Sequence, residues 1–191
     1  VVAHGGPLNG YSLFIQKGRP QFAARINEKL FQVSSKESVV GKWAKLAGAI
    51  TSDGKVVLYV NGSMVASAKV EGLIPKTPAQ GIEIGADDGS AVADYQSPFG
   101  ITAVIDDVRI IHGSFTAADV EEHIEAPEAL KGKTVFASSF TSGKATDESG
   151  LGNDGSIVAA TAVVGRSGKA LHFSGAARGG AKSSGSFVEP H

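Results

Sequence analysis

The stretch Val56-Val57-Leu58-Tyr59-Val60-Asn61-Gly62 decides the fold class. It is an unbroken run of β-branched, aliphatic and aromatic residues that ends on Asn-Gly, and Asp53-Gly54 stands just ahead of it. Asn-Gly and Asp-Gly are the strongest short hairpin signals, because a type I′ turn requires positive φ at its central residues. The stretch therefore predicts a central strand with hairpin partners at 43–50 and 64–68.

Further strand signals continue on both sides of this double hairpin. Short segments with alternating or continuous apolar character, separated by turn residues, predict antiparallel strands. A single helical pattern covers 114–124, where Thr116 can cap the helix with Asp119 as the reciprocal partner. The remaining predicted strands of the first part are 11–15, 22–26, 30–33, 82–84 and 101–111, with the rest of 72–100 in loops.

The composition agrees with an all-β chain and excludes several function classes. The 191 residues include 25 Gly and 7 Pro, which is far more turn residues than a helical bundle tolerates. With 18 basic and 19 acidic side chains the net charge is −1, so the basic surface of a nucleic-acid binder is excluded. No apolar run approaches the roughly 18 residues of a membrane helix, and we expect no membrane insertion. The absence of Cys excludes thiol catalysis, zinc–thiolate sites and disulfides.

The charge balance changes near residue 130 and marks a second segment. Residues 1–130 carry 11 basic and 15 acidic side chains, whereas 131–191 carry 7 basic and 4 acidic ones. The second segment has strand signals at 134–140, 157–160 and 170–173. Residues 176–191 have too little apolar content to fold alone, and they are expected to be a low-complexity tail or the start of a linker.

Three ordered motifs of the first segment resemble one family. They are Leu58-Tyr-Val-Asn-Gly62, Ile82-Glu-Ile-Gly85 and Val104-Ile-Asp-Asp-Val-Arg-Ile-Ile111, the last followed by a small helix. This order resembles the LamG-like jelly-roll domain of the concanavalin A-like lectin/glucanase superfamily, as found in accessory modules of bacterial enzymes. The resemblance implies an all-β fold, a two-sheet antiparallel jelly-roll sandwich with one short helix after the last strong strand.

The second segment resembles the opening of the same family, although it stands at the end of this chain. Phe136-Ala-Ser-Ser-Phe140, Thr146-Asp-Glu-Ser-Gly150 and Gly168-Lys-Ala-Leu-His-Phe-Ser-Gly175 carry the likeness. Either the chain is cut from a tandem array, or 131–175 supplies missing strands to the sandwich of 1–130. We expect the second arrangement, because an incomplete jelly roll would expose unpaired edges and a remnant of about 60 residues cannot bury its own core.

One acidic loop is the candidate ligand site. Carboxylate, amide and aromatic groups can grip sugar hydroxyls or a cation, and a tyrosine ring can offer a stacking face. The alternative is a solvated acidic loop between strands. Trp43, the only tryptophan, is expected in the core rather than on a sugar platform. The candidate ligand-binding residues are Asp87, Asp88, Asp94, Tyr95 and Gln96.

Asp106 is the candidate metal ligand. If 101–111 alternates without interruption, Asp106 shares a face with Val104, Val108 and Ile110. A buried carboxylate is costly unless it is paired, hydrogen-bonded or bound to a cation. The resemblance implies a structural Ca²⁺ ligand at this position; the alternatives are a hydrogen-bonded structural carboxylate and simple exposure.

The sequence gives little support to catalysis. The strand with two glutamates flanking an aspartate that the superfamily's retaining glucanases use is missing, and the five histidines are scattered singly. We therefore expect a non-catalytic accessory module of a larger secreted, cell-surface or periplasmic bacterial protein, binding a polysaccharide or glycan. The alternative is a structural module that docks onto other domains or subunits and binds no small ligand.

Overall fold

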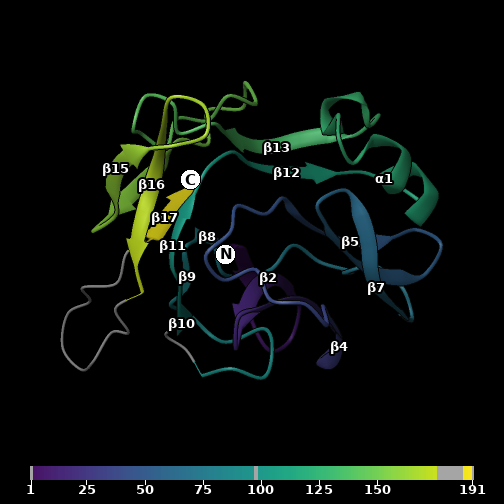
Figure 1. Cartoon of the computed structure of the whole chain (residues 1–191). Coiled ribbons are helices and arrows are strands. Elements are labelled where there is room, and N and C mark those ends of the chain that lie inside the picture. Colours follow the sequence, from purple (N-terminus) through teal and green to yellow (C-terminus); the bar gives the residue numbers. More distant parts are fainter. Residues whose placement is uncertain (1, 97–98, 176–186, 191) are drawn as a thin grey trace.

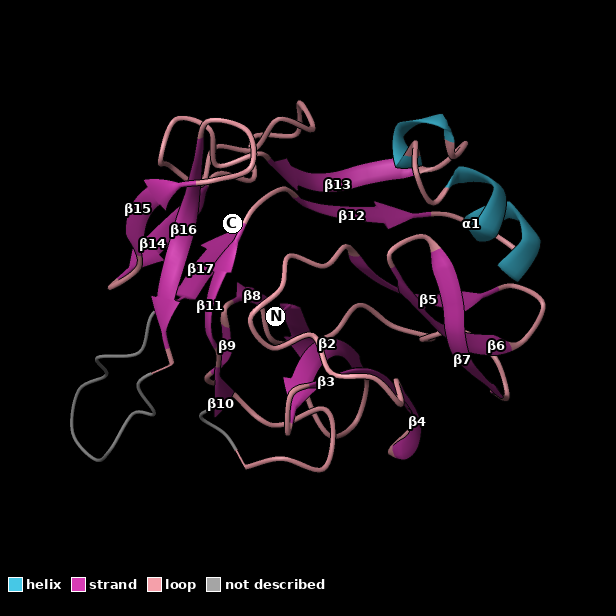
Figure 2. Cartoon of the chain, viewed as in Figure 1, coloured by secondary structure: helices cyan, strands magenta, loops and turns pink. Residues whose placement is uncertain are grey.

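The computed structural model describes residues 2–96, 99–175 and 187–190, and it is built almost entirely of antiparallel strands (Figures 1 and 2). Within those residues lie one short helix, α1 (Ala117–His123), and one 3-10 turn, Pro127–Ala129. No helix among them is long and apolar enough to cross a membrane. The predicted all-β fold is therefore confirmed. The strands of the first segment are β1 (Val2–Gly5), β2 (Gly10–Gln16), β3 (Arg19–Ile26), β4 (Lys29–Ser34), β5 (Leu46–Thr51), β6 (Lys55–Val60), β7 (Ser63–Lys69), β8 (Ile82–Ile84), β9 (Ala86–Asp87), β10 (Phe99–Gly100), β11 (Thr102–Ile105) and β12 (Val108–His112).

The quoted stretch forms β6, the middle strand of a three-stranded sheet in the order β5-β6-β7. This sheet packs on β3 and β4, which belong to a seven-stranded sheet in the order β14-β17-β8-β1-β2-β3-β4, where β14 is Gly155–Val158 and β17 is Phe187–Pro190. Phe22 and Val33 from the larger sheet meet Val56 and Leu58 from β6 in one buried cluster. Alternate residues of β6 thus fill the space between two sheets, as in a sandwich.

The opposite face of β6 is covered by α1 (Ala117–His123). Val57 and Tyr59 pack against Ala117 and Val120 of the helix, and the Tyr59 hydroxyl donates to the Ala117 carbonyl at 3.1 Å. The predicted capping box is confirmed, since Thr116 Oγ1 accepts from the Asp119 backbone and the Asp119 carboxylate accepts from the Thr116 backbone. Both faces of β6 are buried, which explains its unbroken apolar sequence.

The long strand predicted at 101–111 is wrong in its middle. It breaks at Asp106 and Asp107 into β11 and β12, and Asp107 adopts a φ of +50°. Such a conformation is uncommon outside Gly and is tolerated best by Asp and Asn. Because the chain turns there, Ile105, Val108 and Ile110 are all buried, and the alternation across 104–111 is interrupted.

Strands of the second segment hydrogen-bond to both halves of that broken strand. β13 pairs with β12 and runs antiparallel to it, away from α1, whereas β16 pairs with β11 (Figure 1). Phe136, Phe140, Leu171 and Phe173 are fully buried in one cluster with side chains of the first segment, including Ile84. The second segment is therefore packed into the same core. Its strands are β13 (Lys133–Ser138), β14 (Gly155–Val158), β15 (Thr161–Val164), β16 (Lys169–Ser174) and β17 (Phe187–Pro190).

Two further expectations need correction. Trp43 precedes β5 and leaves 46% of its surface exposed, so it is not a core residue. The tail expected at 176–191 is only partly within the described residues, and its residues 187–190 form β17, which pairs with β14 and β8. Strand β15 was not predicted as a separate element.

Candidate ligand-binding face

One face of β2, β3 and β4 carries the candidate site. Because side chains alternate along a strand, Leu13 and Phe22 point toward β5-β6-β7, whereas Phe14 and Ala23 point to the opposite face. Residues 91–96 lie over that opposite face, where Ala93 and Tyr95 pack on it. The candidate loop of the sequence is therefore laid across a sheet face and anchored there.

Tyr95 anchors this loop. Its ring is only 9% exposed, stacks on Phe99 with centroids 4.6 Å apart and meets the edge of Phe14 at 4.9 Å. Its hydroxyl lies 2.9 Å from Ser12 Oγ and 2.6 Å from Asp87 Oδ2. Burial raises the pKa of Asp87, and burial together with the Asp87 charge raises the pKa of Tyr95. Tyr95 and Asp87 are thus a buried hydrogen-bonded pair that fixes the loop.

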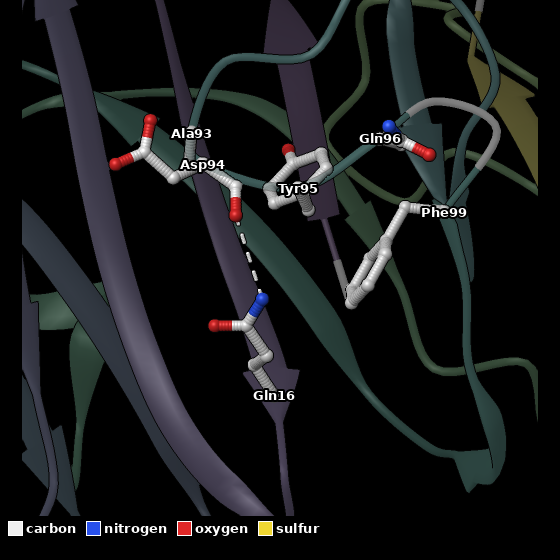
Figure 3. A pocket seen from close by; sticks show the side chains of 6 residues that line it. All are labelled: Gln16, Ala93, Asp94, Tyr95, Gln96 and Phe99. Atoms are coloured by element: carbon white, nitrogen blue, oxygen red, sulfur yellow. Dashed lines mark hydrogen bonds between the residues drawn. The ribbon is translucent and has the colours of Figure 1, made fainter.

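An open, shallow depression lies beside this anchor, at the end of β2 (Figure 3). Asp94 and Gln96 are exposed there, and the half-buried Phe99 presents part of its ring. The Gln16 amide reaches over from β2 and donates to the backbone carbonyl of Asp94 at 3.5 Å. A carboxylate, two amides and an aromatic ring in one depression suit hydroxyl-rich ligands, which need several hydrogen bonds and an apolar contact.

The five predicted ligand residues therefore separate into three groups. Asp94 and Gln96 are exposed in the depression, whereas Tyr95 and Asp87 are buried. Tyr95 contributes to the lining but is only 9% exposed, so its ring is not the exposed stacking face that the sequence suggested. Asp88 lies apart from the depression, partly buried, with its backbone N–H donated to Glu83. Gln16 and Phe99 complete the lining and were not predicted; only the alternation along β2 could have placed Gln16 on this face.

Asp106 lies at the break between β11 and β12, and its surroundings match the hydrogen-bonded carboxylate considered above. The carboxylate is half-buried, and its Oδ2 accepts the Arg166 backbone N–H at 2.8 Å. Over the described ranges no three His, Cys, Asp or Glu side chains gather as a metal-ligand group. A calcium ion at Asp106 would therefore depend largely on backbone carbonyls for its other ligands.

A nearby polar hub organises the loop between β13 and β14. Asp147 accepts backbone N–H groups of Ala137, Ser149 and Asn153 at 2.9–3.2 Å, together with the Ser149 hydroxyl at 2.7 Å. Burial alone would raise the pKa of Asp147, but these hydrogen bonds outweigh it and hold the pKa below its ordinary value. Asp147 is occupied by protein donors, as expected of a structural carboxylate.

A second cavity of about 220 Å³ lies between the larger sheet and β12-β13. His4 of β1 and His112 of β12 line it together with Phe136 and Asn153. His4 is 8% exposed, and its Nδ1 has no hydrogen-bond partner among the described residues. Burial lowers the pKa of His4, and the nearby His112 lowers it further. Burial and the nearby His112 therefore both favour the neutral form of this imidazole.

Comparison with known proteins gives one match. The sequence model of a family described as the concanavalin A-like lectin/glucanases superfamily matches residues 1–121, which cover β1 to β12 and most of α1. Searches of curated proteins and of solved structures returned no match. The matched part contains the whole depression, while the strands of the second segment lie beyond it.

Proposed function

The chain belongs to the concanavalin A-like lectin/glucanase superfamily, and from this premise we propose that it is a non-catalytic carbohydrate-binding module of a larger extracytoplasmic protein. The single observation that supports the proposal best is the lining of the depression. Exposed Gln96 lies beside the partly exposed ring of Phe99, and exposed Asp94 lies across the depression from them (Figure 3). Sugar rings present hydroxyl edges and apolar faces, so this mixture of groups suits them.

The anchored loop also supports binding over a merely solvated loop. Ligand sites gain affinity when their groups are held in place before binding, because less conformational entropy is then lost. The contacts of Tyr95 with Asp87, Ser12 and Phe14 fix the backbone from which Asp94 and Gln96 project. The polar groups at the surface are thus carried by a buried scaffold.

A glycan-array screen of the intact chain tests this proposal, repeated with excess Ca²⁺ and with EDTA. We expect binding to one polysaccharide class, weakened at least tenfold by Phe99→Ala and by Gln96→Ala. Asp94→Asn is compared with the matched control Glu121→Gln, an exposed carboxylate on α1 far along the chain. Binding that survives all three substitutions in the depression would move the site elsewhere.

A second candidate function is docking onto other domains of the parent protein. The observation that favours it is the segment between β4 and β5, where Val40 is 70% and Trp43 is 46% exposed. Large apolar side chains on a surface often mark protein contacts. If no glycan on the array binds with excess Ca²⁺ or with EDTA, this second function is favoured. Trp43→Ala would then be expected to abolish binding to the parent protein.

A further inference from the structure

Three glutamine side chains form a continuous hydrogen-bonded row across β2, β3 and β4. Gln32 Nε2 donates to Gln21 Oε1 at 2.6 Å, and Gln21 Nε2 donates to Gln16 Oε1 at 3.3 Å. Gln16 Nε2 in turn donates to the Asp94 carbonyl at 3.5 Å, as the dashed line in Figure 3 marks. The row therefore joins the far strand of the sheet to the edge of the depression.

The direction of this row is fixed at one end only. An amide group can turn over and exchange its donor and acceptor, but a backbone carbonyl can only accept. Asp94 O therefore requires Gln16 to present its NH₂ group, which leaves Gln16 Oε1 facing Gln21. Gln21 must then present its NH₂ group, and its Oε1 in turn takes the NH₂ group of Gln32. Each side-chain amide in the row therefore points its NH₂ group toward Asp94 and its Oε1 toward the next glutamine or the far end of the row.

This orientation carries a cost at the far end. Gln32 Oε1 is buried and has no hydrogen-bond partner among the described residues. Leaving a buried acceptor unsatisfied destabilises a fold. Gln21 itself is 8% exposed, so solvent does little to relax the arrangement. The direction of the row is thus maintained against a local penalty, which points to a role at its other end.

We propose that Gln21 is a positioning residue: by donating to Gln16 Oε1 it supports the orientation that the Asp94 carbonyl sets, so that Gln16 is a hydrogen-bond donor toward a ligand in the depression and the site recognises an acceptor oxygen of a neutral glycan. The inference rests on the proposed carbohydrate-binding function and adds the polarity of one contact. The NH₂ group of Gln16 has two hydrogens. One is used by Asp94 O, and the second, which has no acceptor among the described residues, can reach a ring, glycosidic or hydroxyl oxygen. Gln21 does not touch the ligand; it holds Gln16 Oε1 away from the depression.

Two substitutions reverse or remove this donor while keeping the side-chain shape. Gln21→Glu places an acceptor-only carboxylate next to Gln16, so the Gln16 amide turns over to donate to it and its oxygen faces the Asp94 carbonyl. Gln16→Glu removes the donor directly. The matched control is Gln32→Met, because Gln32 is oriented by Gln21 and does not set the direction of the row. Thermal melts of each variant confirm that it is folded before binding is measured.

Calorimetric titration with cellohexaose, xylohexaose and mannohexaose measures the effect. For a hexasaccharide that binds the wild type, Gln21→Glu and Gln16→Glu should each weaken affinity about tenfold or more, whereas Gln32→Met should stay within about twofold. Equal affinity of the wild type and both Glu variants would overturn the inference while leaving the proposed function standing. Should Gln21→Glu fail to fold, Gln16→Glu decides alone.

A second test uses the protein alone, without a glycan. In an NMR spectrum of the wild type, the Gln16 side-chain NH₂ protons should show slowed solvent exchange and cross-relaxation to protons of Asp94. Both signatures should disappear in Gln21→Glu and persist in Gln32→Met. If no hexasaccharide binds but the two NMR signatures are present, the carbohydrate-binding function is rejected and the direction of the row stands. If the two NMR signatures are absent from the wild type, the inference itself is rejected.

Discussion

The phenol oxygen of Tyr95 lies 2.6 Å from Oδ2 of Asp87, and this contact holds residues 87–96 on the face of β2 and β3. Both groups are buried, so neither can replace the other's hydrogen bond with water. The pair links the chemistry of the surface loop to the stability of the fold.

Tyr95→Phe should therefore destabilise the protein by about 1–3 kcal/mol, because a buried carboxylate loses a hydrogen-bond donor. Tyr11→Phe is the matched control. The Tyr11 hydroxyl is buried without a partner among the described residues, so its removal should be neutral or slightly stabilising. Urea unfolding of the two variants measures the difference. Equal losses of unfolding free energy would show that the Tyr95–Asp87 contact contributes nothing specific.

Asp106→Ala should lower the free energy of unfolding by about 1 kcal/mol, because the Arg166 N–H loses its acceptor at the turn between β15 and β16. Calcium at this residue stays a prediction, and a metal titration tests it. A bound Ca²⁺ would raise the melting temperature of the wild type, EDTA would reverse the rise, and Asp106→Ala would abolish it. If neither Ca²⁺ nor EDTA changes the melting temperature, the proposed calcium site at Asp106 is rejected.

Stability should fall as the pH drops below about 6.5, and His4 should be a cause. The folded state lowers the pKa of His4 through burial and the nearby His112, so the unfolded chain takes up a proton first. Between the unfolded pKa and the lower folded pKa, each decrease in pH therefore favours unfolding. Urea unfolding from pH 7.5 to pH 5 measures the slope. It should flatten in His4→Gln and persist in the control His172→Gln; an unchanged slope in His4→Gln assigns it to other groups.

We propose that residues 131–175 complete the sandwich formed by the first segment. Deleting 131–191 should leave an insoluble or unfolded product, because β11 and β12 lose β16 and β13 as hydrogen-bonding partners. Phe136 and Leu171 would also leave the shared core, where large-to-small changes alone cost about 2–5 kcal/mol. Circular dichroism and size-exclusion chromatography of the truncation decide: a stable, monomeric, fully β fragment contradicts the proposal.

Local signals predicted most of the fold. The hairpins around β6 follow from Asp53-Gly54 and Asn61-Gly62, whose turn chemistry acts over a few residues, and the capping box of α1 needs only Thr116 and Asp119. The break at Asp107 was missed because the residues on both sides alternate as one strand would. An Asp that tolerates positive φ gives only a weak signal of such a corner.

The candidate site was predicted in part. Which polar residues the loop contains can be read from the loop itself, but which of them are buried depends on residues far away in the sequence. A polar loop with Asp94 and Gln96 was readable as a surface site. The position of Tyr95 depends on Phe14 and Ser12, which lie about 80 residues earlier in the chain, and no pattern within the loop indicates which ring turns inward. Gln16 joined the site through the same long-range packing of the loop on β2.

The break at Asp106 and Asp107 also sets an order of events during synthesis. Its two halves, β11 and β12, stay without their antiparallel neighbours until the ribosome has added β13 and β16, some 20 to 70 residues later. Strand edges left open for that time invite pairing with other nascent chains, and pairings between distant residues form slowly. Because β11 and β12 pair with strands that are synthesised later, chaperone protection of the first 130 residues benefits this domain until β13 and β16 have emerged and paired with them.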